Sequence, residues 1–311
     1  MSADPIIRPC AVRPGARIAV VAPASGCTRD EFDRGVAEIA RLGFEPVYSE
    51  AVFARSVFTA GTPQVRAADF MRAWADPSVA ALVAVRGGYG SVHLLPLLSM
   101  AEVRQTPKLF IGYSDTTSLL SWLTVQCGIP ALHGPMLEGR LSLTAGGYDR
   151  ASFMAMLQGA RDVALTPDGL EVLEPGEARG PLFGGTLTQL VASLGTPYAF
   201  APPPGSVLFL EDVNERPYRI DRMLTQLALA GVLARAQALV FGEMRGCDEP
   251  GGQITARATI AAATRDFGGP VLFGMPSGHT TGPCWTLPLG VTVRVETGSR
   301  PGLIVEDAAV V

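Results

Sequence analysis

Lysine and histidine are both scarce in this chain of 311 residues. Lys108 is the only lysine, and every other basic residue is an arginine. A P-loop nucleotide-binding site requires Gly-Lys-Ser/Thr, whereas Lys108 follows a proline, so the sequence excludes a Walker-type NTPase. A pyridoxal phosphate enzyme would depend on Lys108 alone for its Schiff base, which argues against that class. Chemistry that needs imidazole has three candidates, His93, His133 and His279.

Basic clusters, paired cysteines and long apolar runs are also missing. The formal net charge is −4 without a basic patch, which argues against nucleic acid as a partner. The five cysteines are odd in number and include no C-x-x-C pair, so we expect no disulfide framework, no zinc or other metal site and a reducing, cytoplasmic location. The longest apolar run, Val79–Val85, is far shorter than a bilayer span, so we expect no membrane partner. We expect no cofactor.

The length predicts two domains, because globular domains usually span about 100–200 residues. In residues 1–160, apolar runs alternate with helical patterns, so we expect an N-terminal α/β domain with a parallel sheet between two layers of helices. The capping-box sequence Thr28-Arg29-Asp30-Glu31 predicts the start of a first helix that Gly43 ends. The expected strands are 17–22, 44–48, 80–85 and 108–113, and the other expected helices are 63–75 and 116–126.

Glycine, proline and acidic residues gather around 159–181, and we place a linker between the domains at 161–180. Residues 181–311 are expected to form a smaller C-terminal α/β domain that is rich in β-structure. Its expected strands are 207–210, 238–241 and 271–273, its expected helices lie near 186–194, 217–230 and 254–266, and its expected closing hairpin joins 291–296 to 303–306.

A serine stands between an expected strand and an expected helix in Gly112-Tyr113-Ser114-Asp115-Thr116. A hydroxyl at such a tight turn is exposed, and the backbone N–H groups that follow it point toward any oxyanion that forms. Thr116 replaces the last glycine of G-x-S-x-G, so the signature of the hydrolase fold is not met. The alternative is that Ser114 only caps the helix, with Asp115 in its first turn.

A glycine-rich loop, Arg86–Gly90, follows another buried strand. Glycines at the carboxyl end of a parallel strand allow a ligand to approach the backbone closely. The loop is therefore a candidate for binding an oxyanion or a substrate backbone. A plain turn is the alternative, and the full G-x-G-x-x-G of a dinucleotide site is absent. Arg86 and Tyr89 are candidates for substrate binding, although Arg86 could equally brace the loop.

Two polar segments of the second half offer further candidates. An apolar strand runs directly into Glu211, and an acid at that place can orient an imidazole. The alternative is a solvated helix start with salt bridges. His279 lies on a Gly/Pro loop after another apolar strand, where a lone histidine is commonly a surface residue. For His93 and His133 a structural role is the better interpretation, although His133 could line a cleft.

Together these segments resemble one family, the LD-carboxypeptidase family of serine peptidases, which includes the muramoyl-tetrapeptide carboxypeptidases and the microcin C immunity peptidases. The resemblance spans roughly residues 15–300. It implies that Ser114 is the nucleophile, His279 the base and Glu211 the acid that orients the base. The segments that carry the resemblance, in the order of the family, are Arg86–Gly90, Gly112–Asp115, Leu132–Pro135, Leu210–Asp212, Pro217–Arg219 and Gly278-His279.

The resemblance implies further roles. The acid of the family opens the L-E-D stretch at a strand end, which selects Glu211 over its rival Glu215. The backbone N–H groups of Gly88 and Asp115 are implied as donors to the oxyanion. Relatives often have Gly-Asn-Leu where this chain has Thr186 between Gly and Leu, so the role of that amide side chain is open. Because the nucleophile and the acid–base pair come from different domains, we expect the active site at the domain interface.

The activity implied by the resemblance is a cytoplasmic serine carboxypeptidase of murein recycling. It would cleave the L,D-peptide bond before the terminal D-alanine of a muropeptide tetrapeptide through an acyl-enzyme, and it would be a homodimer. One alternative is an immunity-type peptidase that cleaves peptidyl- or aminoacyl-nucleotides, although residues 140–180 contain no tryptophan on which a base could stack. Another is a ligand-binding module without catalysis. The three histidines form no H-x-x-x-H pair, which disfavours a metallohydrolase.

Overall fold

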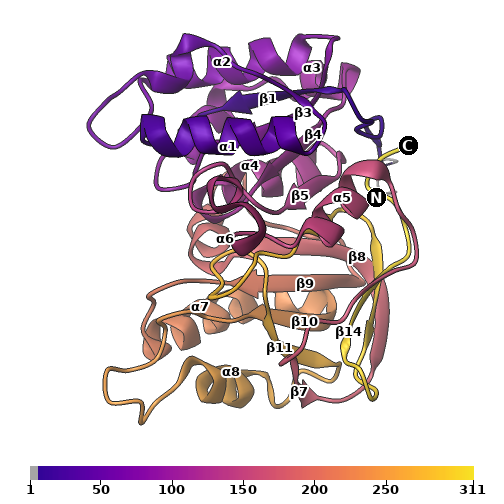
Figure 1. Ribbon diagram of the computed structural model, residues 1–311. Helices are drawn as coiled ribbons and strands as arrows, with labels where there is room; N and C mark the ends of the chain where they lie inside the picture. The colour runs from indigo at the N-terminus through magenta and orange to yellow at the C-terminus, as the bar shows by residue number, and fades with distance from the viewer. Residues whose placement is uncertain (1–5) are drawn as a thin grey trace.

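The computed structural model describes residues 6–311 as two β-sheets, one above the other in Figure 1, with helices packed around them. The upper sheet belongs mainly to the first half of the chain. β12 is antiparallel to β5, and the other neighbouring strands are parallel. In spatial order the strands of this six-stranded sheet are β12 (Leu287–Leu289), β5 (Ala131–His133), β4 (Leu109–Gly112), β3 (Val79–Ala84), β1 (Arg17–Val21) and β2 (Glu45–Val47).

The helices of the first half begin where the sequence provides caps. Thr28 Oγ1 accepts the backbone N–H of Glu31 at the start of α1, and Thr62 caps α2, which begins with a proline. Phe32 on α1 and Phe70 on α2 are fully buried against the sheet. The four expected strands and the first two of the three expected helices are confirmed. The helices of this half are α1 (Arg29–Arg41), α2 (Pro63–Ala75), α3 (Met100–Gln105), α4 (Thr117–Ser121) and α5 (Arg150–Gln158).

The lower sheet has eight strands and belongs to the second half of the chain. Its central strands β8, β9, β10 and β11 are parallel, whereas β13 and β14 form the expected antiparallel hairpin beside β8. In spatial order the strands are β6 (Val163–Leu165), β14 (Gly302–Val305), β13 (Thr292–Glu296), β8 (Glu177–Thr186), β9 (Ser206–Glu211), β10 (Ala236–Gly242), β11 (Val271–Met275) and β7 (Glu171–Glu174). The helices are α6 (Leu187–Ser193), α7 (Pro217–Leu229) and α8 (Ala256–Thr264).

Two segments differ from the expected elements. Residues 161–180, expected as a linker, contain β6, β7 and the start of β8. β6 and β7 are the two edge strands of the lower sheet, and an edge strand tolerates polar residues because one side of it stays unpaired. The helix expected at 116–126 is irregular, since a 3-10 turn (Ser114–Thr116), α4 and a π-helical turn (Trp122–Gln126) follow one another.

One strand crosses between the halves. β12 lies in the sequence between β11 and β13 of the lower sheet, yet it pairs with β5 and forms the edge of the upper sheet. The division into domains at 1–160 and 181–311 stays a prediction. Among residues 6–311, no helix has the length and apolar character that crossing a bilayer requires.

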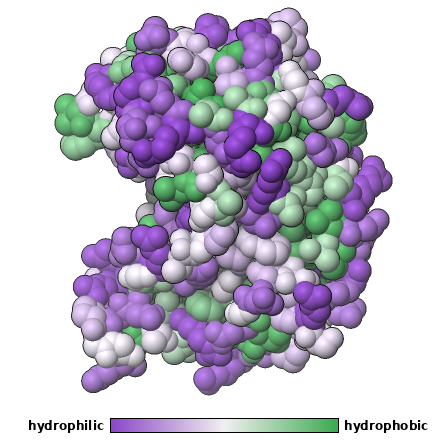
Figure 2. All heavy atoms as spheres, in the orientation of Figure 1, coloured by the Kyte–Doolittle hydropathy of each residue, from purple (hydrophilic) through white to green (hydrophobic). Residues whose placement is uncertain are grey.

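The surface is indented between the two halves (Figure 2). A cleft of about 450 Å³ lies there, and its walls come from both halves. Residues between 89 and 121 form one wall, and residues between 189 and 198 form the other. Tyr89, Asp115 and Thr117 are among the lining residues, so this cleft adjoins the candidate active site.

Candidate active site

Ser114 lies just after β4, at the carboxyl end of the upper sheet. Its φ of 63° falls in the left-handed region, which costs a non-glycine residue about 1 kcal/mol or more. Thr116 stabilises the turn, since its Oγ1 donates a hydrogen bond of 2.8 Å to the carbonyl of Tyr113. A Cβ atom on Gly87 would lie only 2.9 Å from Ser114 Oγ, so glycine at this position leaves room for the hydroxyl. The turn therefore presents a serine hydroxyl from a strained backbone.

The glycine-rich loop Arg86–Gly90 packs against this turn. The Asp115 carboxylate accepts hydrogen bonds from the backbone N–H groups of Gly90 (3.0 Å) and Ser91 (2.8 Å). The Asp115 carbonyl accepts another from Ser91 Oγ (2.6 Å). Gly88 has a φ of 91°, a conformation that suits glycine. The buried side chain of Asp115 thus fixes the loop beside Ser114, and glycine at position 88 allows the left-handed backbone conformation there.

Glu211 and His279 form a hydrogen-bonded pair at the carboxyl end of the lower sheet. Glu211 ends β9, and its side chain is only 1% exposed. His279 follows β11, and its Nδ1 lies 2.8 Å from Glu211 Oε2. The backbone N–H of His279 donates to the same oxygen at 3.1 Å. Because the Nδ1–H group of His279 donates to this carboxylate, Nε2 carries no proton and is available as a base.

The other oxygen of Glu211 is held by Thr186, whose Oγ1 donates a hydrogen bond to Oε1. Burial disfavours the charged carboxylate, but the charge and hydrogen bond of His279, together with the Thr186 hydroxyl, lower the pKa of Glu211 to about 2. Glu211 is therefore ionised at neutral pH. The backbone N–H of Thr186 also donates to Thr117 Oγ1 (3.1 Å), so Thr186 connects the acid to the helix that follows Ser114.

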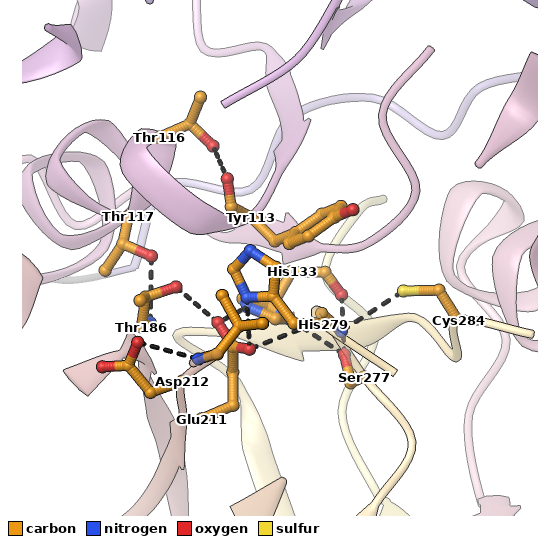
Figure 3. A network of polar contacts seen from close by, with 12 residues as sticks. Tyr113, Thr116, Thr117, His133, Thr186, Glu211, Asp212, Ser277, His279 and Cys284 are labelled. Atoms are coloured by element: carbon orange, nitrogen blue, oxygen red, sulfur yellow. Dashed lines mark hydrogen bonds and ion pairs between the residues drawn. The ribbon is translucent and has the colours of Figure 1, made fainter. Parts of the chain in front are cut away.

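Side chains of the first half hold the loop of His279. Tyr113 packs edge-on against the imidazole of His279, with 5.1 Å between ring centroids. Arg140 is buried and donates hydrogen bonds to the carbonyls of Gly278 (2.8 Å) and Thr280 (3.1 Å). Figure 3 shows Tyr113 on one side of this polar network and Glu211 on the other. The serine turn and the acid–base pair therefore meet at the interface of the two halves.

The structure does not join all three candidate residues by hydrogen bonds. Within residues 6–311 no hydrogen bond links Ser114 Oγ to His279, although Ser114 follows Tyr113 directly and Tyr113 contacts His279. In hydrolases such a bond often tightens only when substrate is bound. The rival acid Glu215 forms an ion pair with Arg219 (3.4 Å) and lies two residues before α7.

The two candidates for substrate binding have different environments. Arg86 forms an ion pair with Glu138 (2.7 Å), so its guanidinium braces the loop from the side. Tyr89 is 49% exposed and lies at the mouth of the site, where its ring meets Phe58 and His93 edge-on at 6.3 and 5.2 Å. Tyr89 is therefore the better placed of the two to contact a ligand.

Sequence reasoning missed Arg140, whereas for His133 it favoured a structural role. Arg140 lies in no recognisable motif, and its role arises from backbone carbonyls that are about 140 residues away in the sequence. His133 is fully buried beside Glu211, in the stretch that also contributed to the family resemblance. Within residues 6–311, no three His, Cys, Asp or Glu side chains are grouped so that they could hold a metal ion.

Comparison with known proteins identifies the family. Residues 18–134 match the model of the LD-carboxypeptidase N-terminal domain, and residues 179–295 match that of the LD-carboxypeptidase C-terminal domain. The chain belongs to the LD-carboxypeptidase family. The resemblance inferred from the motifs is confirmed, and the protein is a serine-type peptidase of this family.

Individual relatives cover nearly the whole enzyme. A putative carboxypeptidase of Streptomyces coelicolor is 36% identical and aligns over 96% of this chain and 98% of its own. The murein tetrapeptide carboxypeptidase of Pseudomonas aeruginosa is 31% identical, over 85% of this chain and 88% of its own.

Solved structures share the fold. The muramoyltetrapeptide carboxypeptidase of Oxalobacter formigenes superposes with a TM-score of 0.83 at 27% identity, covering 94% of this chain and 99% of its own. The wild-type microcin C7 self-immunity protein MccF superposes with a TM-score of 0.88 at 22% identity, covering 98% of this chain and all of its own. The mixed α/β fold with two sheets is therefore shared with both, and the expected fold class is confirmed.

Proposed function

We propose that this enzyme is a serine carboxypeptidase that hydrolyses the L,D-peptide bond before the terminal D-alanine of muropeptide tetrapeptides. Ser114 is the nucleophile, His279 the general base and acid, and Glu211 the residue that orients His279. The observation that carries the proposal is the Glu211–His279 hydrogen bond of 2.8 Å, formed at the interface where the strained turn of Ser114 also lies.

The proposed reaction has two stages. His279 Nε2 takes the proton of Ser114 Oγ as this oxygen attacks the carbonyl carbon of the scissile bond. The imidazolium, stabilised by the ionised Glu211, then protonates the amine of D-alanine, which leaves as the acyl-enzyme forms. A water molecule, activated by the same imidazole, releases the shortened peptide and restores Ser114.

Backbone N–H groups of Gly88 and Asp115 would receive the oxyanion. The proposal is supported by the fixed course of the loop, because the Asp115 side chain ties Gly90 and Ser91 to the serine turn. Each such donor contributes roughly 3–4 kcal/mol to stabilising the transition state. Donors held in advance need no reorganisation as the charge develops, so this loop is suited to the role.

The substrate assignment is supported by two relatives that are more similar in sequence to this chain than MccF, which is 25% identical. The Pseudomonas aeruginosa protein at 31% identity is a murein tetrapeptide carboxypeptidase, and a Bacillus subtilis relative at 30% is a probable murein peptide carboxypeptidase. We also propose a cytoplasmic location, supported by five cysteines that remain unpaired as thiols, and a homodimer, on the family resemblance. Size-exclusion chromatography with light scattering tests the dimer.

The direct test is release of D-alanine from a tetrapeptide that ends in D-alanine. We expect release by the native enzyme and a loss of at least about a thousandfold in Ser114→Ala. Ser78→Ala is the matched control and should keep full activity. Ser78 is an exposed serine at the amino end of β3, the opposite end of the sheet from Ser114. No release by the native enzyme, or equal release by Ser114→Ala, would contradict the proposal.

A second candidate is an immunity-type peptidase acting on peptidyl- or aminoacyl-nucleotides. It is supported by the MccF structures, one of which holds aspartyl sulfamoyl adenosine and superposes with a TM-score of 0.87. The same triad would perform this reaction. Direct competition between a tetrapeptide and an aminoacyl-nucleotide analogue, with kcat/KM measured for each, decides between the two substrates.

A further inference from the structure

His133 is a buried imidazole that the proposed reaction does not use. It ends β5, is fully buried, and its Nε2 lies 3.9 Å from Glu211 Oε1 (Figure 3). Among the described residues, Nε2 has no hydrogen-bond partner, whereas Nδ1 lies 2.9 Å from Ser277 Oγ. Ser277 is only two residues before His279. His133 thus contacts both the acid and the loop of the base.

The surroundings of His133 determine which nitrogen carries the proton. Burial lowers the pKa of His133 to about 4, so the ring is neutral near pH 7 and carries one proton. A lone pair on Nε2 would face the charged Glu211 carboxylate and be repelled, whereas an N–H is attracted. The proton therefore belongs on Nε2, and Nδ1 accepts the hydroxyl proton of Ser277. The competing acceptor for that hydroxyl, the His133 carbonyl, is more distant at 3.5 Å.

Packing leaves these groups little freedom. Gly278 lies between Ser277 and His279 with a φ of 81°. A Cβ atom at this position would be 2.8 Å from Glu211 Cδ and 2.8 Å from His133 Cε1. The backbone of the loop is therefore pressed against the acid and the buried imidazole together, and a shift of His133 would displace both.

We propose that His133 is a positioning residue for the acid–base pair: its Nε2–H faces Glu211 Oε1, and its Nδ1 holds Ser277 and with it the loop of His279. This role rests on the proposed triad. The titratable groups that face His133 are Glu211 on β9, His279 after β11 and Tyr113 after β4, the last with 6.0 Å between ring centroids. Since His133 stays neutral, its N–H dipole compensates part of the Glu211 charge without cancelling it.

The protonation state can be read without any activity. The chain has three histidines, so long-range ¹H–¹⁵N spectra of histidine-labelled enzyme contain three imidazole patterns. Spectra of His93→Gln and His133→Phe assign them. We expect His133 to remain in the neutral Nε2–H form from pH 5.5 to 8. A neutral Nδ1–H form, or titration within this range, would overturn the proposal.

The kinetic role is tested with His133→Phe, which keeps a ring of similar size but removes both nitrogens. We expect kcat to fall about tenfold, the rate equivalent of one hydrogen bond, with KM nearly unchanged. The acid limb of the kcat/KM profile should move to higher pH, because a less compensated Glu211 favours the protonated form of His279. His133→Gln, whose amide can restore an N–H toward Glu211, should recover part of kcat.

Ser277→Ala keeps the proposal testable if His133→Phe does not fold. It removes only the partner of Nδ1, and we expect a smaller fall in kcat while His133 keeps the Nε2–H form in the spectra, because the Glu211 carboxylate is unchanged. A folded His133→Phe with native kcat and native pH profile would refute the positioning role. Full activity of Ser114→Ala would instead refute the triad, and it would leave the spectroscopic result on His133 unaffected.

Discussion

Thr186 is the residue where this chain departs from the Gly-Asn-Leu pattern of its relatives, and its hydroxyl donates to Glu211 Oε1. The variant Thr186→Val keeps the shape of the side chain and removes this donor. A buried carboxylate oxygen would then lose its hydrogen bond. We expect both the free energy of unfolding and kcat to fall, because the acid becomes less stable and less fixed.

The size of the effect follows from the contacts of Glu211. A hydrogen bond to a charged group contributes about 1.5–3 kcal/mol, so we expect a loss of this order in the free energy of unfolding. Oε2 keeps both bonds from His279, of 2.8 and 3.1 Å, so the acid–base pair stays connected. We therefore expect only part of this lost free energy to destabilise the transition state. The expected fall in kcat is about tenfold, which corresponds to roughly 1.4 kcal/mol.

Thr188→Val is the matched control. Thr188 Oγ1 donates a 2.6 Å hydrogen bond to Asp212, which is the same chemistry on the neighbouring carboxylate. Urea unfolding should show a comparable loss for both variants, while D-alanine release should slow only in Thr186→Val. Thr186→Asn, which restores the pattern of the relatives, should keep most of the activity. Equal kcat values for native enzyme, Thr186→Val and Thr188→Val would refute the reasoning.

The same contact predicts a pH dependence of stability. The folded state holds the pKa of Glu211 at about 2, below its ordinary value near 4.5. The ionised carboxylate therefore adds stability above about pH 4.5, and this contribution is lost as the pH falls toward 2. Without the Thr186 hydroxyl the pKa of Glu211 rises, so the pH range over which this stability is lost becomes narrower. Urea unfolding between pH 3 and 7 should show a smaller acid-induced loss of stability in Thr186→Val than in native enzyme, and this loss should level off at a higher pH.

Three further substitutions test the site. Gly87→Ala would place a Cβ atom 2.7 Å from Ser114 Cβ, so kcat should fall at least about a hundredfold while circular dichroism stays native. The ammonium group of Arg140→Lys cannot donate to several carbonyls in the planar arrangement of a guanidinium. We therefore expect about a tenfold lower kcat and a Tm lower by a few degrees in calorimetry. Tyr89→Ala should raise KM with kcat nearly unchanged. A native KM would contradict its role in binding.

The sequence was sufficient for the parts of the site that local patterns encode. Ser114 follows a continuous apolar strand and Glu211 ends another, and such strands are recognisable because both faces are buried. His279 required the family resemblance, because a histidine on a Gly/Pro loop has no pattern of its own. The central strands and most helices were predictable for the same reason as Ser114, since burial imposes periodicity on the sequence.

Long-range contacts were not predictable in this way. Arg140 acts on carbonyls about 140 residues away, and no local signal marks a carbonyl as an acceptor. Strands β6 and β7 have a single neighbour each; β6 is only three residues long and β7 has a glutamate at both ends, so neither shows the continuous apolar pattern of a central strand. The three-residue β12 is too short for a periodic pattern, and its pairing with β5 depends on the tertiary fold.

The crossing of β12 limits how the enzyme can open. The chain passes between the two sheets three times: after α5, before β12 and after β12, where only Gly290 and Val291 precede β13. Three separate chain connections join the two halves, and one of them is only two residues long. Such connections resist a wide hinge rotation of one half against the other. We therefore expect substrate to reach the site through the existing cleft beside Tyr89 and Asp115, and the two halves to behave in solution as one stiff body.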